Sequence, residues 1–133
     1  MGNETNARGP EMPQKLEIKE DERGKLIEIF KIPEAGQFVY ITTKPGVTRG
    51  NHYHLRKIER FCVLQGDAEI SMRRLFTDTV HTYRVSGQEP VYIDIPTFTS
   101  HNMKNVGKTL LETLFWSNEV FTLEDPDTFS EVV

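Results

Sequence analysis

The stretch GVTRGNHYHLRKIERFCVLQG, residues 46–66, places two histidines one residue apart, followed by a glutamate at the start of an apolar segment. Side chains two positions apart share one face of a β-strand, so His52 and His54 project together while Tyr53 points the other way. The segment that opens at Glu59 returns antiparallel beside them. We therefore interpret the two imidazoles as half of a metal site and Glu59 as a candidate third ligand.

A fourth candidate ligand comes much later in the chain. His101 lies in PTFTSHNMKN, residues 96–105, and completes a candidate set of three imidazoles and one carboxylate. Nitrogen and oxygen ligands of this kind suit zinc, iron, nickel or manganese, and the ligand type alone does not choose among these metals. The remaining histidine, His81, lies outside this pattern in a polar segment, and we expect it at the surface.

Alternation of apolar and polar residues is the main pattern beyond residue 13 and predicts half-buried strands. Turn sequences such as Pro45-Gly46 and Ser86-Gly87 separate the segments. Short strands with such spacing are typical of a sandwich or barrel. Helix is expected only as a single turn at 125–129, where Pro126 suits a first helical position. The alternating segments are 16–18, 26–30, 38–42, 61–63, 70–72, 91–95 and 111–115.

Length and composition indicate one globular domain, residues 14–133, preceded by a flexible tail at 1–13. No apolar run approaches the roughly 18–20 residues that span a bilayer, and the first residues lack the order of a signal peptide. The one cysteine, Cys62, cannot form a disulfide within the chain. We therefore expect a cytoplasmic protein that has no membrane partner.

Charge is distributed unevenly along the chain. The formal net charge is −4, which argues against a basic face that binds nucleic acid. Residues 49–74, however, hold six Lys and Arg against three Asp and Glu, a local charge of +3. A cationic zone on an acidic protein favours a small anionic ligand.

The histidine segments resemble the two sequence motifs of the cupins. Two departures from the second motif occur: Phe98 stands where a glycine is usual, and Gly87 lies nine residues before Pro96, where six is usual. The resemblance covers about residues 16 to 120 and implies an all-β fold, a single antiparallel jelly-roll barrel. The matching patterns are Gly46-x5-His52-x-His54-x4-Glu59-x6-Gly66 and Pro96-x4-His101-x3-Asn105.

A narrower resemblance links the chain to the C-terminal zinc cupin domain of capsular-polysaccharide UDP-sugar epimerase/reductases. Residues 21–24, 44–54, 114–121 and 125–128 carry it, and stand-alone sugar-nucleotide 3,4-ketoisomerases are more loosely similar. It implies a zinc-dependent isomerase that epimerises carbon 3 of a UDP-linked 4-keto-6-deoxy-N-acetyl sugar in surface polysaccharide synthesis, and a homodimer. The residues leave the nucleotide open between UDP and dTDP. Because the chain has no Gly-x-Gly-x-x-Gly motif, we expect a separate reductase or transferase to act downstream.

Enolisation next to a ketone needs a group that stabilises the enolate oxygen and groups that carry the proton. The candidate proton carriers are a metal-bound water, Tyr40, Tyr92 and Lys57. In a second mechanism, suggested by the ketoisomerases, His52 and His54 themselves move the proton. The sequence does not separate these mechanisms.

Arginines of the cationic zone are candidates to bind the substrate's diphosphate in bidentate fashion; they are Arg49, Arg60, Arg73 and Arg74. Two other functions stay open. A non-catalytic sugar- or metal-binding cupin module would bind ligand without exchanging hydrogen at the sugar ring. A metal-dependent cupin dioxygenase would consume oxygen.

Overall fold

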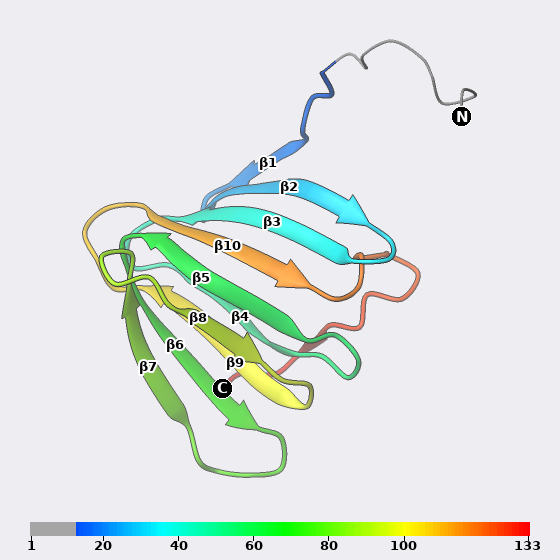
Figure 1. Ribbon diagram of the computed structural model, residues 1–133. Coiled ribbons are helices and arrows are strands. Elements are labelled where there is room, and N and C mark those ends of the chain that lie inside the picture. Colours follow the sequence, from blue (N-terminus) through cyan, green and yellow to red (C-terminus); the bar gives the residue numbers. More distant parts are fainter. Residues whose placement is uncertain (1–12) are drawn as a thin grey trace.

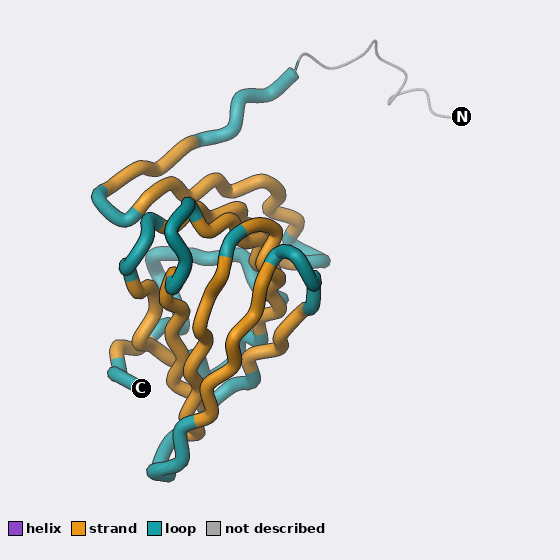
Figure 2. The backbone as a smooth tube through the Cα atoms, turned by 90° about the vertical axis from the view of Figure 1, so that its left-hand side faces the viewer, coloured by secondary structure: helices purple, strands orange, loops and turns teal. Residues whose placement is uncertain are grey.

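The computed structural model describes residues 13–133, within which eleven strands form two antiparallel sheets (Figures 1 and 2). The six-stranded sheet has the order β1-β2-β3-β10-β5-β8. Its strands are β1 (Ile18–Asp21), β2 (Gly24–Ile32), β3 (Gly36–Thr43), β10 (Leu111–Ser117), β5 (Glu59–Gln65) and β8 (Tyr92–Ile95).

The five-stranded sheet has the order β11-β4-β9-β6-β7 and folds over the first sheet. Its strands are β11 (Phe129–Ser130), β4 (Thr48–Tyr53), β9 (Thr99–Asn105), β6 (Asp67–Arg74) and β7 (His81–Ser86). This confirms the expected all-β jelly roll. Most of the predicted tail lies outside the described residues. No helix among the residues described is long and apolar enough to cross a membrane.

The core lies between the two sheets and is built from the inward-facing half of the alternating pattern. Phe61 of β5 stacks on Phe115 of β10, with ring centroids 4.8 Å apart. Around this pair lie Val63, Ala68, Ile70, Ile95, Met103 and Leu111. Since Phe61, Ile95, Met103 and Phe115 also line a cavity, the core forms the floor of the candidate site described below.

A β-bulge interrupts β4 immediately before the first histidine. The register with β9 shifts between Gly50 and His52, and Asn51 between them has a φ of 59°. Gly50 has a φ of 102°, and a Cβ at this position would lie 2.8 Å from the carbonyl oxygen of His101. The bulge therefore needs glycine for both its backbone conformation and its close approach to β9.

The prediction of a single helical turn at 125–129 is wrong. This segment forms a loop followed by β11, and Asp127 adopts a φ of 48°, which interrupts a right-handed helix. The carboxylate of Asp127 accepts hydrogen bonds from backbone N–H groups of the loop after β4. Tertiary hydrogen bonds thus decide the conformation at a place where the local pattern suggested a turn of helix.

Candidate metal centre

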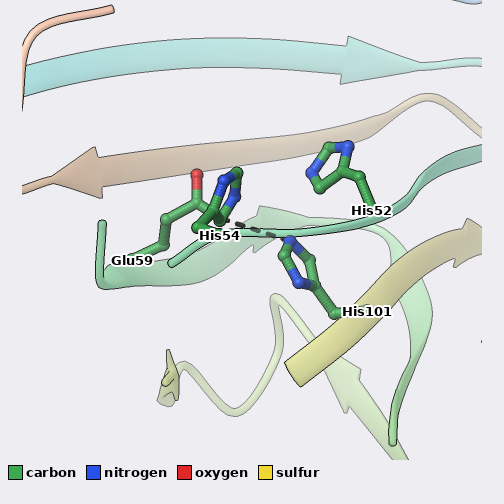
Figure 3. Close-up of side chains that lie close together, drawn as sticks. All are labelled: His52, His54, Glu59 and His101. Carbon is green, nitrogen blue, oxygen red and sulfur yellow. Dashed lines mark hydrogen bonds and ion pairs between the residues drawn. The ribbon is translucent and has the colours of Figure 1, made fainter. Parts of the chain in front are cut away.

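Four side chains from different parts of the chain meet between the two sheets: His52, His54, Glu59 and His101 (Figure 3). His52 belongs to β4, and His54 follows the end of that strand. Glu59 begins β5, and His101 lies opposite His52 in the pairing of β4 with β9. The structure thus brings together all four residues that the sequence nominated, and their ligand atoms lie within 4.8 Å of one another.

Glu59 contacts two of the three imidazoles. Its Oε1 atom is 3.2 Å from Nε2 of His54 and 3.3 Å from Nε2 of His101. The centroid of the His52 ring lies 4.7 Å from that of His101 and 5.1 Å from that of His54. His54 and His101 are buried, and 17% of the Glu59 side chain is exposed.

Backbone carbonyl groups orient two of the imidazoles. Nδ1 of His54 lies 2.7 Å from the carbonyl oxygen of Asp127, and Nδ1 of His101 lies 3.1 Å from that of Thr99. A carbonyl oxygen only accepts, so each Nδ1 carries a proton and donates it. Nε2 of each ring faces Glu59: while it carries a proton it can donate to the carboxylate, and once it loses that proton its lone pair can bind a metal ion. Histidines that bind metals in proteins are held by the same kind of hydrogen bond.

The electrostatics of the cluster favour an ionised glutamate. Burial opposes the charge of Glu59, but hydrogen bonds to His101 and His54 outweigh it and hold the pKa of the carboxyl well below its usual range. Burial and the neighbouring His101 and His54 lower the pKa of His52 to about 4. Burial disfavours the charged form of His54, yet the Glu59 carboxylate raises the pKa of this imidazole above its ordinary value.

This donor set fits a divalent metal ion. Three neutral imidazole nitrogens and one carboxylate oxygen are ligands that zinc, iron, nickel and manganese accept. The four ligand atoms lie close enough to share one ion.

Two cavities meet at the cluster. The first, which we call the arginine chamber, has a volume of about 240 Å³ and is bordered by Arg23, Arg49, His52, Glu59 and His101. The second, the lysine chamber, measures about 350 Å³ and is bordered by Gln37, His52, His54, Lys57 and Glu59. Because His52 and Glu59 border both cavities, a ligand in either chamber can reach the cluster.

Arg49 and Arg23 provide the positive charge of the arginine chamber. Nε of Arg49 donates to Oγ1 of Thr43 and its Nη2 to the carbonyl oxygen of Thr42, each at 3.0 Å. Burial, reinforced by the charge of Arg23, lowers the pKa of Arg49. Arg23 is in turn held by Asp21, whose Oδ2 lies 2.6 Å from its Nη2.

Lys57 is the buried cation of the lysine chamber, which the exposed Lys19 also borders. Only 6% of Lys57 is exposed, and its Nζ lies 5.3 Å from the centroid of the Phe121 ring and 3.5 Å from Oγ1 of Thr128. Burial lowers the pKa of Lys57, although the nearby Glu59 and Asp127 act in the opposite direction.

Other candidate residues lie away from the two chambers. Arg60 is on the outer face of β5, paired with Asp94 at 2.6 Å and with its guanidinium 4.0 Å from the Tyr92 ring centroid. Tyr92 is 61% exposed on β8. The hydroxyl of Tyr40 donates to Glu112.

Arg73 and Arg74 border neither chamber. Arg73 binds the carboxylate of Glu131 and the carbonyl oxygen of Val133. His81 is exposed on β7, as expected.

Sequence reasoning missed three residues at the site, which are Arg23, Gln37 and Asp127. Arg23 and Asp127 lie in the flanking segments DERG and DPDT that resemble the epimerase/reductases. The resemblance therefore included both residues, but it assigned neither of them a role at the site. Gln37 lies on the inward face of β3, next to the apolar Phe38. A single glutamine in a strand has no recognisable motif, so only the fold could reveal it.

Comparison with known proteins agrees with this architecture. A family model described as "Polysaccharide biosynthesis C-terminal domain" matches residues 19–129. The chain is 36% identical over 110 residues to the UDP-2-acetamido-2,6-beta-L-arabino-hexul-4-ose reductase of Pseudomonas aeruginosa strain PA103, covering 83% of this chain and 30% of the reductase. It is 23% identical over 124 residues to the spore coat polysaccharide biosynthesis protein SpsL of Bacillus subtilis strain 168, covering 86% of this chain and 82% of SpsL.

A solved structure is also similar. The capsular polysaccharide assembling protein CapF from Staphylococcus aureus superposes with a TM-score of 0.89 at 38% identity, covering 91% of this chain and 35% of CapF. The chain thus spans about a third of the length of CapF and of the reductase.

Proposed function

Because the chain belongs to the family of polysaccharide biosynthesis C-terminal domains, we propose that it isomerises a nucleotide-linked 4-keto-6-deoxy sugar by enolisation. The observation that carries this proposal is the position of the cluster of His52, His54, Glu59 and His101 at the junction of two chambers. One chamber offers guanidinium groups for an anion, and the other offers a buried ammonium group beside the cluster.

The substrate class follows from the relative and from the charges. The name of the Pseudomonas reductase describes a UDP-linked sugar with an acetamido group on carbon 2 and a ketone on carbon 4. We propose a substrate of this class, linked to UDP or dTDP. Arg49 and Arg23 would bind the diphosphate, because guanidinium groups match phosphate oxygens in bidentate fashion. Arg60 and Arg73 are already paired with carboxylates outside the chambers.

The cluster would hold a divalent metal through His52, His54, Glu59 and His101, and we propose zinc. When bound, such an ion supplies Lewis-acid polarisation of a carbonyl oxygen, which makes the neighbouring C–H bond more acidic. The hydrogen bonds from His54 and His101 to backbone carbonyl groups hold these rings in place before the substrate arrives. The apolar floor of Phe61 and Phe115 excludes water from one side of the arginine chamber.

Proton transfer is assigned to Lys57, which is buried in the lysine chamber beside the cluster. The alternative is that His52 and His54 move the proton, since both rings border the same chamber. Tyr92 is the less favoured candidate because its position on the exposed face of β8 separates it from both chambers.

Hydrogen exchange at the sugar ring tests the proposal. UDP- and dTDP-linked 4-keto-6-deoxy sugars are incubated with the metal-loaded protein in deuterated water and followed by proton NMR. Deuterium entering at carbon 3 or 5 is the expected result and identifies the carbon. Loss of exchange on chelation supports the role of the metal over the histidine mechanism. Binding without exchange contradicts the proposed catalysis and favours a non-catalytic module, and oxygen uptake by the metal-loaded protein would favour a dioxygenase.

The remaining expectations accompany this proposal. We expect a homodimer in the cytoplasm and a separate reductase or transferase that consumes the product. Analytical ultracentrifugation measures the oligomeric state directly.

A further inference from the structure

Arg73 lies on β6, outside both chambers, and only 16% of its side chain is exposed. Its Nη2 donates to Oε2 of Glu131 at 3.0 Å and to the carbonyl oxygen of Val132 at 3.1 Å. Its Nε donates to the carbonyl oxygen of Val133, also at 3.1 Å. The planar guanidinium suits several acceptors at once, and here three of its hydrogen bonds reach one short segment of the chain.

This segment belongs to residues 127–133, which we call the strap. The strap pairs antiparallel with β4, on the side of β4 that does not face β9. Phe129 pairs with Tyr53 and stacks on its ring at 5.3 Å, and Ser130 pairs with His52. Without the strap, β4 would be an edge strand of the five-stranded sheet. The strap therefore encloses the strand that carries the first histidine and leads to the second.

The backbone of Glu131 contacts the neighbours of two ligand histidines. Its N–H donates to the carbonyl oxygen of Asn51 at 2.9 Å, and its carbonyl oxygen accepts from Oγ of the buried Ser100 at 2.5 Å. Asn51 precedes His52 and Ser100 precedes His101. Since the guanidinium on β6 holds the carboxylate of this same glutamate, one residue links that guanidinium to both strands that carry ligands.

The strap also holds the bulge of β4. Oδ1 of Asn51 accepts from the backbone N–H of Val133 at 3.2 Å and from Nδ2 of Asn102 at 3.0 Å. Asn51 has the positive φ of 59° that shifts the register of β4 with β9 just before His52. The hydrogen bonds of the strap thus stabilise the backbone conformation that directs this histidine into the cluster.

All three imidazoles of the cluster are supported from the strap. His54 is held directly, by the carbonyl oxygen of Asp127, whereas His52 and His101 are held through the residue that precedes each. A metal ion requires its ligand atoms at defined distances, with a tolerance of about 0.2 Å. Residues that orient ligands therefore affect metal affinity without contacting the ion.

We propose that Arg73 is a positioning residue for the metal centre: it anchors the strap, and the docked strap holds the three histidines in the arrangement that one ion requires. The inference rests on the proposed metal centre and is independent of the proposed reaction. Linkage requires the reverse effect as well. A metal ion that binds more tightly when the strap is docked must stabilise docking by the same factor.

Amide hydrogen exchange tests this coupling without any substrate. The N–H groups of Glu131 and Val133 are followed by NMR in the zinc-loaded and the chelated protein. Chelation should speed their exchange about tenfold, the effect expected for groups that orient metal ligands. Amides of the edge strand β7, which borders neither chamber, open locally and should keep their rates. No change in the strap, or an equal change in β7, would overturn the inference.

Zinc affinity, measured by competitive titration, tests the anchor itself. Arg73→Met keeps an unbranched side chain and removes the donors, so it should weaken zinc binding about tenfold. Arg74→Met is the matched control, because the exposed side chain of Arg74 has no hydrogen bond or ion pair within residues 13–133; it should change the affinity by less than about twofold. Unchanged affinity in Arg73→Met would overturn the inference.

A core variant separates positioning from a general loss of stability. Val63→Ala removes a buried side chain that borders neither chamber, so it should destabilise the fold and keep the zinc affinity of the original protein. An equal loss of affinity in Val63→Ala and Arg73→Met would show that stability alone controls metal binding, which contradicts the positioning role.

A double variant tests whether Arg73 acts through the strap. Glu131→Ala removes the carboxylate and keeps the backbone contacts, so adding it to Arg73→Met should weaken zinc binding little further. Additive losses would contradict the anchoring role. A strap that responds to zinc without deuterium exchange at the sugar ring refutes the proposed reaction alone. Sugar exchange with a strap that ignores zinc, or with no zinc bound, refutes this inference and leaves enolisation standing.

Discussion

Nδ1 of His54 lies 2.7 Å from the carbonyl oxygen of Asp127, although 73 residues separate the two in sequence. The carboxylate of the same Asp127 accepts the backbone N–H groups of Leu55, Arg56 and Lys57, at 3.0, 2.9 and 2.8 Å. One residue of the C-terminal segment therefore holds both an imidazole of the cluster and the loop that leads from it to Glu59.

The first prediction concerns these hydrogen bonds of Asp127 with His54 and with the backbone of residues 55–57, which we call the clamp. Asp127→Ala should lower the free energy of unfolding by about 1–3 kcal/mol, because three backbone donors lose their acceptor. Alanine also tolerates the φ of 48° poorly. Since the backbone of residue 127 positions His54, metal affinity should fall about tenfold. Urea denaturation and competitive metal titration measure the two effects.

Asp125→Ala is the matched control, because Asp125 is exposed and pairs with Arg56 at the surface. It should change stability by no more than about 0.5 kcal/mol. Equal stability of the two variants would refute the clamp.

The second prediction is the pH dependence of the clamp. Burial opposes the charge of Asp127, but the three backbone N–H groups together outweigh it and hold the pKa of this carboxyl below its usual value. An unfolded aspartate has a pKa of about 3.9. The stabilisation is therefore complete above about pH 4 and is lost as the pH falls through the lower folded pKa.

The original protein should lose more stability than Asp127→Asn between pH 5 and pH 3. Asparagine tolerates positive φ and cannot ionise. Its amide nitrogen replaces one of the two accepting oxygens, which lowers stability at every pH, so only the change of stability with pH reports the carboxylate charge. Glu59 contributes acid sensitivity to both proteins and cancels in the difference. Urea midpoints at pH 5, 4 and 3 test this, and parallel curves for the two proteins would exclude Asp127 as the source.

The third prediction concerns the metal. A chelator should lower the free energy of unfolding by about 2.7 kcal/mol if the metal was present at 100 times its Kd. His101→Gln should remove both the bound metal and this sensitivity to chelation. His81→Gln, on the exposed strand β7, should behave like the original protein. Thermal denaturation and elemental analysis give the readouts, and full metal content in His101→Gln would contradict the assigned ligand set.

The fourth prediction separates two arginines that the sequence treats alike. Arg49 borders the arginine chamber, whereas Arg60 pairs with Asp94 on the outer face of β5. Arg49→Gln should weaken binding of a UDP-sugar about tenfold or more, because a hydrogen bond to a charged group is lost. Arg60→Gln should change the affinity by less than about twofold. Calorimetry measures the affinity of each variant for the UDP-sugar. Equal losses of affinity in both variants would contradict the assignment of the anion site to the arginine chamber.

Much of the candidate cluster could be predicted from sequence. The period of two in a β-strand gives His52 and His54 a common face, and the turn after them returns Glu59 to their side. His101 was predicted by the spacing of its motif. The alternating pattern predicted a β-sandwich or barrel, and the resemblance to the cupins implied the jelly roll. These inferences succeeded because they depend on local periodicity or on a motif that carries its own spacing.

The residues proposed to bind the substrate were harder to predict from sequence. Arg49 and His52 are three positions apart, so a regular strand would place them on opposite faces, and only the bulge at Asn51 lets both border the same chamber. Phe98 replaces the glycine of the second motif and still adopts a φ of 57°. Its backbone N–H donates to the carbonyl oxygen of His54, a tertiary contact that supports this conformation.

The sequence by itself indicated many of the strands through their alternating pattern, although not β9 or β11. It also nominated the four side chains that meet between the sheets, through the shared face of His52 and His54 and the spacing of the two motifs. Only the tertiary structure decided which charges face the cavity, what anchors the strap and what orients His54. Those properties depend on contacts between segments as distant as Arg73 and Glu131, or His54 and Asp127. No local pattern encodes such contacts, since burial and hydrogen-bond pairing exist only once the two sheets have closed on each other.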